Sequence, residues 1–161
     1  MKDTPKFIVD INVGKLAKWL RMMGYDALLF DGRDDNSMVK TALSEGRIVL
    51  TKDSQIMRRR LVATGKLKVI YTPSDTPEEQ LKQVVSAANL DYQFRPFSLC
   101  LECNQPLLSR SREEVQGWVP PYVFQTQHQY MECPTCHRIY WRGTHWQAMS
   151  NRLKELVGTV G

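Results

Sequence analysis

Four cysteines in two pairs constrain this chain more than any other feature of its sequence. Two residues separate Cys100 from Cys103, and two separate Cys133 from Cys136. This spacing lets one tight turn direct two sulfurs at a tetrahedral Zn²⁺ ion, so two pairs complete the coordination of a single ion. Because four thiolates leave no open position on the metal, the pattern predicts a structural Zn²⁺ site that organises a small C-terminal module.

Paired cysteines have two other uses. Two disulfides would suit an extracellular chain, and a thioredoxin-like redox pair would need a strand–helix–strand context, which neither pair has. The residues directly after the pairs, Asn104 and His137, are expected to ease the two turns. The 29 residues between the pairs exceed the commonest spacing in zinc ribbons.

The composition is that of a soluble globular protein, with 42% hydrophobic and 24% charged residues. No apolar stretch approaches the length that crosses a membrane. The first residues lead into a strand-like run rather than a signal segment. We therefore expect a cytoplasmic protein with no membrane partner, whose reduced thiols remain available to metal.

The charge is moderately basic and unevenly distributed. Residues 1–90 contain 15 Lys and Arg against 11 Asp and Glu, whereas the remainder contains 7 against 6. The formal net charge is +5. A Zn(Cys)₄ centre carries two negative charges, so the metal-loaded chain is nearer to about +3. A basic N-terminal part suits a polyanionic partner, but a charge this small does not identify one.

Apolar runs alternate with amphipathic segments through the first 90 residues. The pattern predicts strands at 6–11, 25–30, 47–51 and 67–72, and helices at 15–23, 37–45, 54–63 and 76–88. This alternation is typical of an α/β fold with a doubly wound parallel sheet. We expect an α/β domain at 1–90, a linker at 91–97, and a zinc ribbon with a C-terminal helix (145–157) at 98–161.

Aspartates follow the ends of the expected strands. Asp10, Asp31, Asp53 and Asp75 come after the first to the fourth strand, and Asp34 and Asp35 precede the second helix. The carboxyl ends of parallel strands share one edge of the sheet, where sites form in open α/β folds. If the strand order is 2-1-3-4, Asp10 and Asp53 are neighbours at that edge.

Helix capping is the alternative use of several of these residues. Asp35, Asp53 and Asp75 each stand where a helix cap is expected, whereas Asp10 interrupts an apolar strand and has no helix directly behind it. Crowded carboxylates repel each other unless a divalent cation neutralises them. Mg²⁺ or Mn²⁺ bound by carboxylates and substrate phosphate resolves that repulsion, so the pattern favours a metal-dependent nuclease.

Four segments resemble the Mut-seven C-terminal RNase domain family, a branch of the PIN-like nucleases. They are residues 7–26, 46–53, 96–104 and 133–146. The resemblance implies a PIN-like fold followed by a zinc ribbon, and an acidic metal-dependent ribonuclease centre. By matching positions it implies catalytic and Mg²⁺ or Mn²⁺-binding roles for Asp10 and Asp53. Related PIN-like sequences often have an acidic residue at the start of the second helix, which implies the same role for Asp35, with Asp34 as the competing residue. Many PIN nucleases have a fourth carboxylate, for which Asp75 is the candidate.

Basic and aromatic residues supply candidates for RNA binding. Lys15 and Lys18 follow the Asp10 loop and suit phosphate contacts, with a solvated helix face as the alternative. In the ribbon, Arg142 and His145 stand among aromatic rings, the combination that stacks bases and holds backbone phosphates. Packing within the protein is the prediction for Trp141.

The sequence thus predicts a metal-dependent ribonuclease that cleaves RNA, expected to be single-stranded, with a zinc ribbon that assists RNA binding. Two alternatives remain open. The first is a non-catalytic RNA-binding module that assists another nuclease, and the second is an adaptor whose ribbon meets a protein partner.

Overall fold

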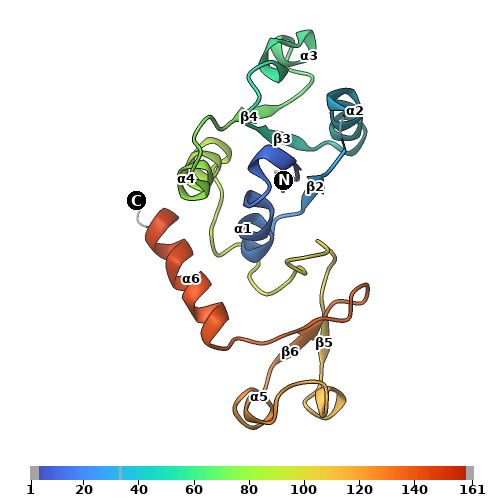
Figure 1. Ribbon diagram of the computed structural model, residues 1–161, viewed down its shortest axis with the longest axis vertical. Coiled ribbons are helices and arrows are strands. Elements are labelled where there is room, and N and C mark those ends of the chain that lie inside the picture. Colours follow the sequence, from blue (N-terminus) through green and yellow to red (C-terminus); the bar gives the residue numbers. More distant parts are fainter. Residues whose placement is uncertain (1–3, 33, 159–161) are drawn as a thin grey trace.

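A four-stranded parallel sheet forms the centre of the first part of the chain in the computed structural model, which describes residues 4–32 and 34–158. Its strands are β1 (Phe7–Asp10), β2 (Ala27–Phe30), β3 (Ile48–Thr51) and β4 (Val69–Tyr71). They pair in the order β2-β1-β3-β4 (Figure 1). The first three residues of β1 are apolar and fully buried, as expected for a strand covered on both faces.

Helices cover both faces of this sheet. The larger ones are α1 (Leu16–Met23), α2 (Asp35–Glu45) and α4 (Pro77–Ala88). Leu16 and Leu81 from α1 and α4 pack with Phe7, whereas Met38 from α2 packs with Ile8, the next residue of β1. Because successive strand residues point to opposite faces, α1 and α4 lie on one side and α2 on the other. This arrangement confirms the α/β fold with a parallel sheet.

The segment 54–63, predicted to be one helix, forms two short pieces instead. They are the 3₁₀ turn η2 (Ile56–Arg58) and the single turn α3 (Arg60–Ala63). Arg59 between them has an extended backbone. The apolar residues Ile56 and Leu61 are five positions apart, so one continuous helix would not present both to the core. The break allows both to pack there.

The cysteine-containing part is built on a small antiparallel sheet of β5 (Leu108–Arg110), β6 (Tyr130–Glu132) and β7 (Ile139–Tyr140), in that order. Between β5 and β6 the chain forms the turn η3 (Glu113–Val115) and the helix α5 (Pro121–Thr126). Val115 and Val123 from these elements pack around Tyr130 in a separate apolar cluster. This insertion accounts for the long spacing between the cysteine pairs.

The last helix, α6 (Thr144–Val157), runs back from the ribbon to the parallel sheet part (Figure 1). Leu153 and Leu156 belong to the same buried cluster as Leu81 and Val84 of α4. The helix predicted at 145–157 is confirmed, and its apolar face completes the core of the α/β layer. No helix within residues 4–32 and 34–158 has the length and apolar character needed to cross a membrane.

Candidate acidic site and zinc centre

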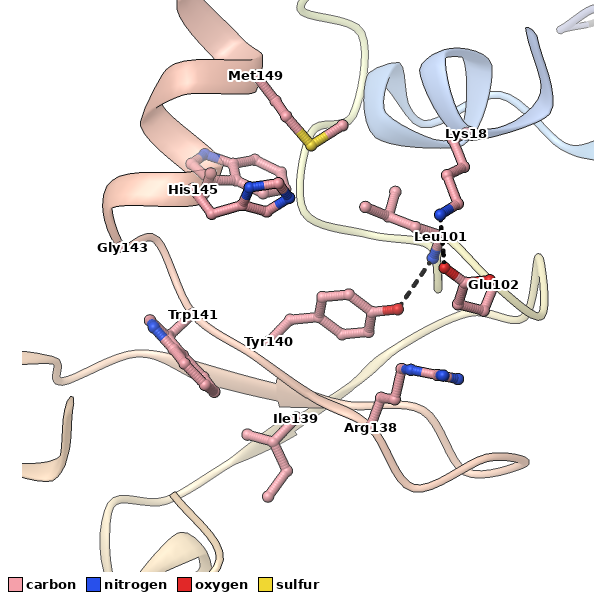
Figure 2. A pocket seen from close by; sticks show the side chains of 11 residues that line it. Lys18, Leu101, Glu102, Arg138, Ile139, Tyr140, Trp141, Gly143, His145 and Met149 are labelled. Atoms are coloured by element: carbon pink, nitrogen blue, oxygen red, sulfur yellow. Dashed lines mark hydrogen bonds and ion pairs between the residues drawn. The ribbon is translucent and has the colours of Figure 1, made fainter. Parts of the chain in front are cut away.

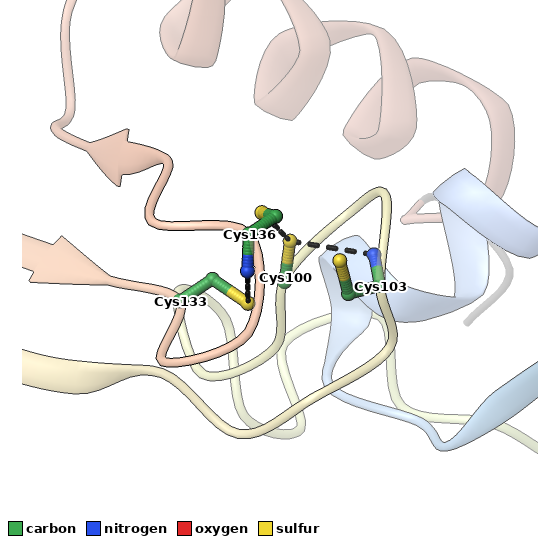
Figure 3. Close-up of side chains that lie close together, drawn as sticks. All are labelled: Cys100, Cys103, Cys133 and Cys136. Carbon is green, nitrogen blue, oxygen red and sulfur yellow. Dashed lines mark hydrogen bonds between the residues drawn. The ribbon is translucent and has the colours of Figure 1, made fainter.

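The four cysteines converge on one point (Figure 3), although the two pairs are far apart in sequence. Their Sγ atoms all lie within 4.8 Å of one another, and all four thiols are free. Cys100 and Cys133 are fully buried. Among the described residues, no other group of three or more His, Cys, Asp or Glu side chains lies this close together. Four sulfur donors at this spacing could hold a Zn²⁺ ion.

The two turns that carry these cysteines repeat the same geometry. The amide of Asn104 donates to the carbonyl of Cys100 at 2.9 Å, and that of His137 donates to Cys133 at 2.8 Å. Asn104 and His137 both have a left-handed backbone, with φ of 61° and 64°. The expectation that these two residues ease the turns is confirmed. We call the turns 100–104 and 133–137 the first and second knuckle.

Neighbouring groups favour ionised sulfur, the form that binds metal, at Cys136 but not at Cys103, whose pKa the hydrogen bond with Cys136 raises to about 12. Burial raises the pKa of the Cys136 thiol, but hydrogen bonds from Arg138 and from other thiols lower it to about 6. Tyr140 places its hydroxyl 3.1 Å from Cys100 Sγ and accepts a hydrogen bond from the Leu101 amide at 3.2 Å. Burial raises the pKa of Tyr140, and Cys100 raises it further.

The first knuckle is bonded to the α/β part. Asn104 Oδ1 accepts from the Ala27 amide at 3.0 Å, and its Nδ2 donates to Asp26 Oδ1 at 2.7 Å. Arg21, which is only 6% exposed, donates from Nε to the Ala27 carbonyl and from Nη1 to the Leu101 carbonyl at 2.8 Å. The knuckle therefore contacts the sheet part through directional, partly buried hydrogen bonds.

At the carboxyl edge of the sheet, Thr51 connects two of the candidate acidic residues. Asp10 ends β1 and is 9% exposed. Its Oδ2 accepts from the hydroxyl of Thr51 at 2.7 Å, and that same hydroxyl oxygen accepts from the Asp53 amide at 3.0 Å. The observed strand order makes β1 and β3 neighbours, which is the condition under which Asp10 and Asp53 were expected to meet.

Two adjacent aspartates at the start of α2 have different roles. Asp34 is the N-cap, since its side chain accepts from the Asn36 amide at 2.9 Å and from the Ser37 hydroxyl at 3.1 Å. The cap is therefore not Asp35. Asp35 is half-buried, and burial, followed by the negative charges of Asp53 and Asp10, raises its pKa. Asp35 is therefore near enough to Asp53 and Asp10 for their charges to influence it, although the three carboxylates are not gathered as closely as the four sulfurs.

Asp53 has a second, local role, and Asp75 lies outside the group formed by Asp10, Asp35 and Asp53. Asp53 also forms a local turn, because its Oδ1 accepts from the Gln55 amide at 2.9 Å. Asp75 has an 89% exposed side chain and pairs with Lys52 Nζ at 3.1 Å. The cap of α4 is Thr76, so the interpretation of Asp75 as a helix cap is wrong. We use "acidic edge" for Asp10, Asp35 and Asp53.

A shallow hollow of about 280 Å³ opens beside Asp35, and its lining includes Arg58 and Arg59. Arg59 donates from Nη1 to Asn36 Oδ1 at 2.8 Å, and its positive charge opposes the rise in the pKa of Asp35. The acidic edge therefore has cations next to it that suit phosphate groups.

The two lysine candidates lie at different places on the N-terminal helix. Lys15 directly precedes α1 and is exposed. Lys18, one turn further along, forms an ion pair with Glu102 of the first knuckle at 2.8 Å. With both side chains largely exposed, such a pair contributes little stability. Lys18 thus faces the ribbon.

The two ribbon candidates are also separated. His145 lines a pocket together with Lys18 (Figure 2). Arg142 lies over the ring of Phe97, 5.0 Å from its centroid, and lines neighbouring hollows instead. Trp141 packs against the cluster around Tyr130, so the packing role predicted for it is confirmed.

The chain matches the family model described as Mut7-C RNAse domain over residues 5–153, a range that includes the acidic edge and both knuckles. The chain belongs to the Mut7-C RNAse domain family. Comparisons with curated proteins and with solved structures gave no match. Membership of the Mut7-C family indicates a nuclease-like role, with RNA as the implied substrate.

Sequence reasoning assigned no role to Thr51, and for Asn104 it predicted the turn but not the bonds to the sheet part. Thr51 ends an apolar strand two positions before Asp53, so a polar residue at that strand end was a usable signal. The bonds of Asn104 to Asp26 and Ala27 span nearly 80 positions, and no local pattern indicates them.

Proposed function

We propose that this protein is a metal-dependent ribonuclease that cleaves phosphodiesters of single-stranded RNA at the acidic edge, with the zinc ribbon assisting RNA binding. The observation that carries the proposal is the placement of three carboxylates where two central parallel strands end. Asp10 and Asp53 are joined through Thr51, and Asp35 lies near both at the start of α2. Open α/β folds form their sites at this edge.

The donor set fits a hard divalent cation. Carboxylate oxygens are the ligands that Mg²⁺ and Mn²⁺ take. Burial raises the pKa of Asp35 and the charges of Asp53 and Asp10 raise it further, so a cation beside Asp35 would offset this unfavourable charge. Such an ion supplies an activated water and stabilises the leaving oxygen. Asp10, Asp35 and Asp53 would hold it.

The protein's own groups position the carboxylates and the RNA. The Thr51 hydroxyl fixes the orientation of Asp10, and the Gln55 amide fixes that of Asp53. Arg58 and Arg59 beside Asp35 suit the backbone of an RNA strand lying across the edge. Lys15, at the start of α1, supplies a further cation.

Other parts of the proposal rest on the family and on the chemistry of the thiols. We propose a PIN-like ancestry for the sheet part, supported by its strand order and its acidic edge. A division of the sequence into 1–90, 91–97 and 98–161, in which the last helix of the third segment packs back on the first, is also part of the proposal. So is a cytoplasmic location that keeps the cysteines reduced.

The test is cleavage of single-stranded RNA with added Mg²⁺ or Mn²⁺, using Asp10→Asn and Asp53→Asn variants. Each substitution keeps the side-chain shape and removes a charge, so cleavage should fall by about 100-fold or more while RNA binding persists. If cleavage is unchanged in both variants, the nuclease proposal fails. A non-catalytic RNA-binding module then replaces it if RNA still binds, and a protein adaptor if it does not.

A further inference from the structure

The structure contains a second candidate nucleic-acid site, away from the acidic edge. We infer that the pocket between the ribbon, α1 and α6 holds one unpaired RNA base. This inference rests on the proposed function in taking RNA as the ligand. The pocket measures about 310 Å³, and its lining includes Lys18, Arg138, Tyr140, Trp141, His145 and Trp146. We call it the seam pocket.

Flat rings surround the seam pocket. Figure 2 shows the Tyr140 ring pointing towards Leu101, with Trp141 beside it and His145 entering from α6. Every nucleobase has two apolar faces, which stack on aromatic side chains without regard to sequence. The aliphatic side chain of Met149 completes the lining. A flat, unpaired base fits this chemistry.

The edges of the pocket are polar and mostly cationic. Lys18 enters from α1 and pairs with Glu102, while Arg138 is exposed at the end of the second knuckle. A base has polar edges as well as apolar faces, so ring walls with a charged rim match it better than they match an apolar peptide side chain.

A place for the adjoining phosphate lies next to the rings. Helix α6 begins at the pocket, since Gly143, its N-cap, and His145 are both lining residues. Glycine offers no side-chain acceptor, and no side chain caps this 14-residue helix. Its first amides and the positive end of its dipole therefore suit an anion. Arg142 adjoins the same helix start.

The zinc centre shapes the seam pocket. Leu101 and Glu102 come from the first knuckle, and Arg138 directly follows the second. Tyr140 accepts from the Leu101 amide and lies 3.1 Å from Cys100 Sγ, so the knuckle sets the direction of its ring. The ribbon side of the pocket therefore depends on an ordered metal site, whereas His145, Trp146 and Met149 line it from α6.

The experiment measures how tightly the protein binds a fluorescein-labelled oligouridine and the same strand without bases. All proteins carry Asp10→Asn, so that the RNA stays intact. When the pocket is left open, the protein should bind the base-containing strand about 5- to 150-fold more tightly than the strand without bases, the range expected for stacking one base. Met149→Trp fills the pocket and should remove that preference while leaving binding of the abasic strand unchanged.

Asn151→Trp is the matched control, because it adds the same ring at an exposed position of α6 outside the pocket. Circular dichroism and zinc content must match among the variants. Equal affinities for the two strands, or equal behaviour of Met149→Trp and Asn151→Trp, would overturn the inference. RNA cleavage by the wild-type chain is measured separately, so loss of base preference and loss of the nuclease proposal can be told apart.

Discussion

The hydroxyl of Thr51 on β3 donates a 2.7 Å hydrogen bond to the carboxylate of Asp10 on the neighbouring strand β1. The same oxygen accepts from the Asp53 amide. One buried side chain thus sets the positions of two residues of the acidic edge. Valine has nearly the same shape as threonine but can neither donate nor accept these hydrogen bonds.

Thr51→Val should therefore reduce RNA cleavage by about 10- to 100-fold, as expected when a residue that orients metal ligands is lost. The buried Thr72 on the adjacent strand provides a control, since its hydroxyl bonds only to the Thr51 carbonyl. Steady-state cleavage rates for Thr51→Val and Thr72→Val test the difference. Equal rates would remove Thr51 from the site.

The neighbours Asp34 and Asp35 should respond differently to the same change. Asp35→Asn removes a charge from the acidic edge, so cleavage should fall by about 100-fold. Asp34→Asn keeps a good N-cap, so the cleavage rate should stay near that of wild type. Cleavage assays on the pair decide the point, and a larger loss in Asp34→Asn would reverse the assignment.

The stability of the protein should depend on pH through Asp35. Burial and the charges of Asp53 and Asp10 raise its pKa above the ordinary value of 3.8. The folded state therefore prefers the protonated acid. The stability that the folded state gains from protonated Asp35 is fully present below pH 3.8. It is lost as the pH rises through the raised pKa of Asp35.

Asp35→Asn should accordingly be more stable than wild type at neutral pH, without added metal, and the gain should disappear at about pH 3.5. Urea unfolding at the two pH values measures this. Asp75→Asn, at an exposed position, serves as the control and should show no such gain. A gain of the same size at both pH values would contradict the explanation.

Asn104 and His137 occupy equivalent positions after the two knuckles, which permits a matched pair of glycine substitutions. Glycine accepts the left-handed backbone at both sites. Only Asn104→Gly loses hydrogen bonds to the sheet part, so it should lower the free energy of unfolding by about 1–3 kcal/mol. His137→Gly loses an exposed contact with Glu132 and should cost less. Denaturant unfolding at equal zinc content compares them, and equal losses would show that the bonds of Asn104 contribute little.

Removal of zinc should disorder the knuckles and the ribbon but leave most of α6 in place. Without metal, the bonds that gather the four sulfurs are lost, whereas Leu153 and Leu156 remain in the core of the sheet part. Amide signals from nuclear magnetic resonance before and after a zinc-selective chelator provide the measurement. Purified protein should contain about one zinc per chain. A zinc-free preparation with an ordered ribbon would contradict the prediction.

Much of the fold was predictable because its signals are local. Alternating apolar segments indicated the parallel sheet, and the cysteine spacing indicated the knuckles. Asn104 and His137 were expected to ease the two turns, and their left-handed backbone does so. Aspartates at strand ends indicated the acidic edge. These features depend on neighbours within a few positions, which a sequence displays directly.

Other features depend on partners that are distant in the sequence. The break at Arg59 follows from the positions at which Ile56 and Leu61 reach the core. Which of Asp34 and Asp35 caps α2, and which lies near Asp10, follows from the fold around them. The seam pocket joins four separate segments. None of these relationships leaves a periodic pattern, so the structure was needed to find them.

The return of α6 to the sheet part makes the ribbon an insertion in a longer domain, so a cut at residue 90 would not release an independent unit. A fragment ending there would keep all four parallel strands. It would, however, expose to water the faces of Leu81 and Val84 that pack with Leu153 and Leu156. Such a fragment should therefore aggregate or unfold, and the smallest autonomous piece of this chain has to include its last helix.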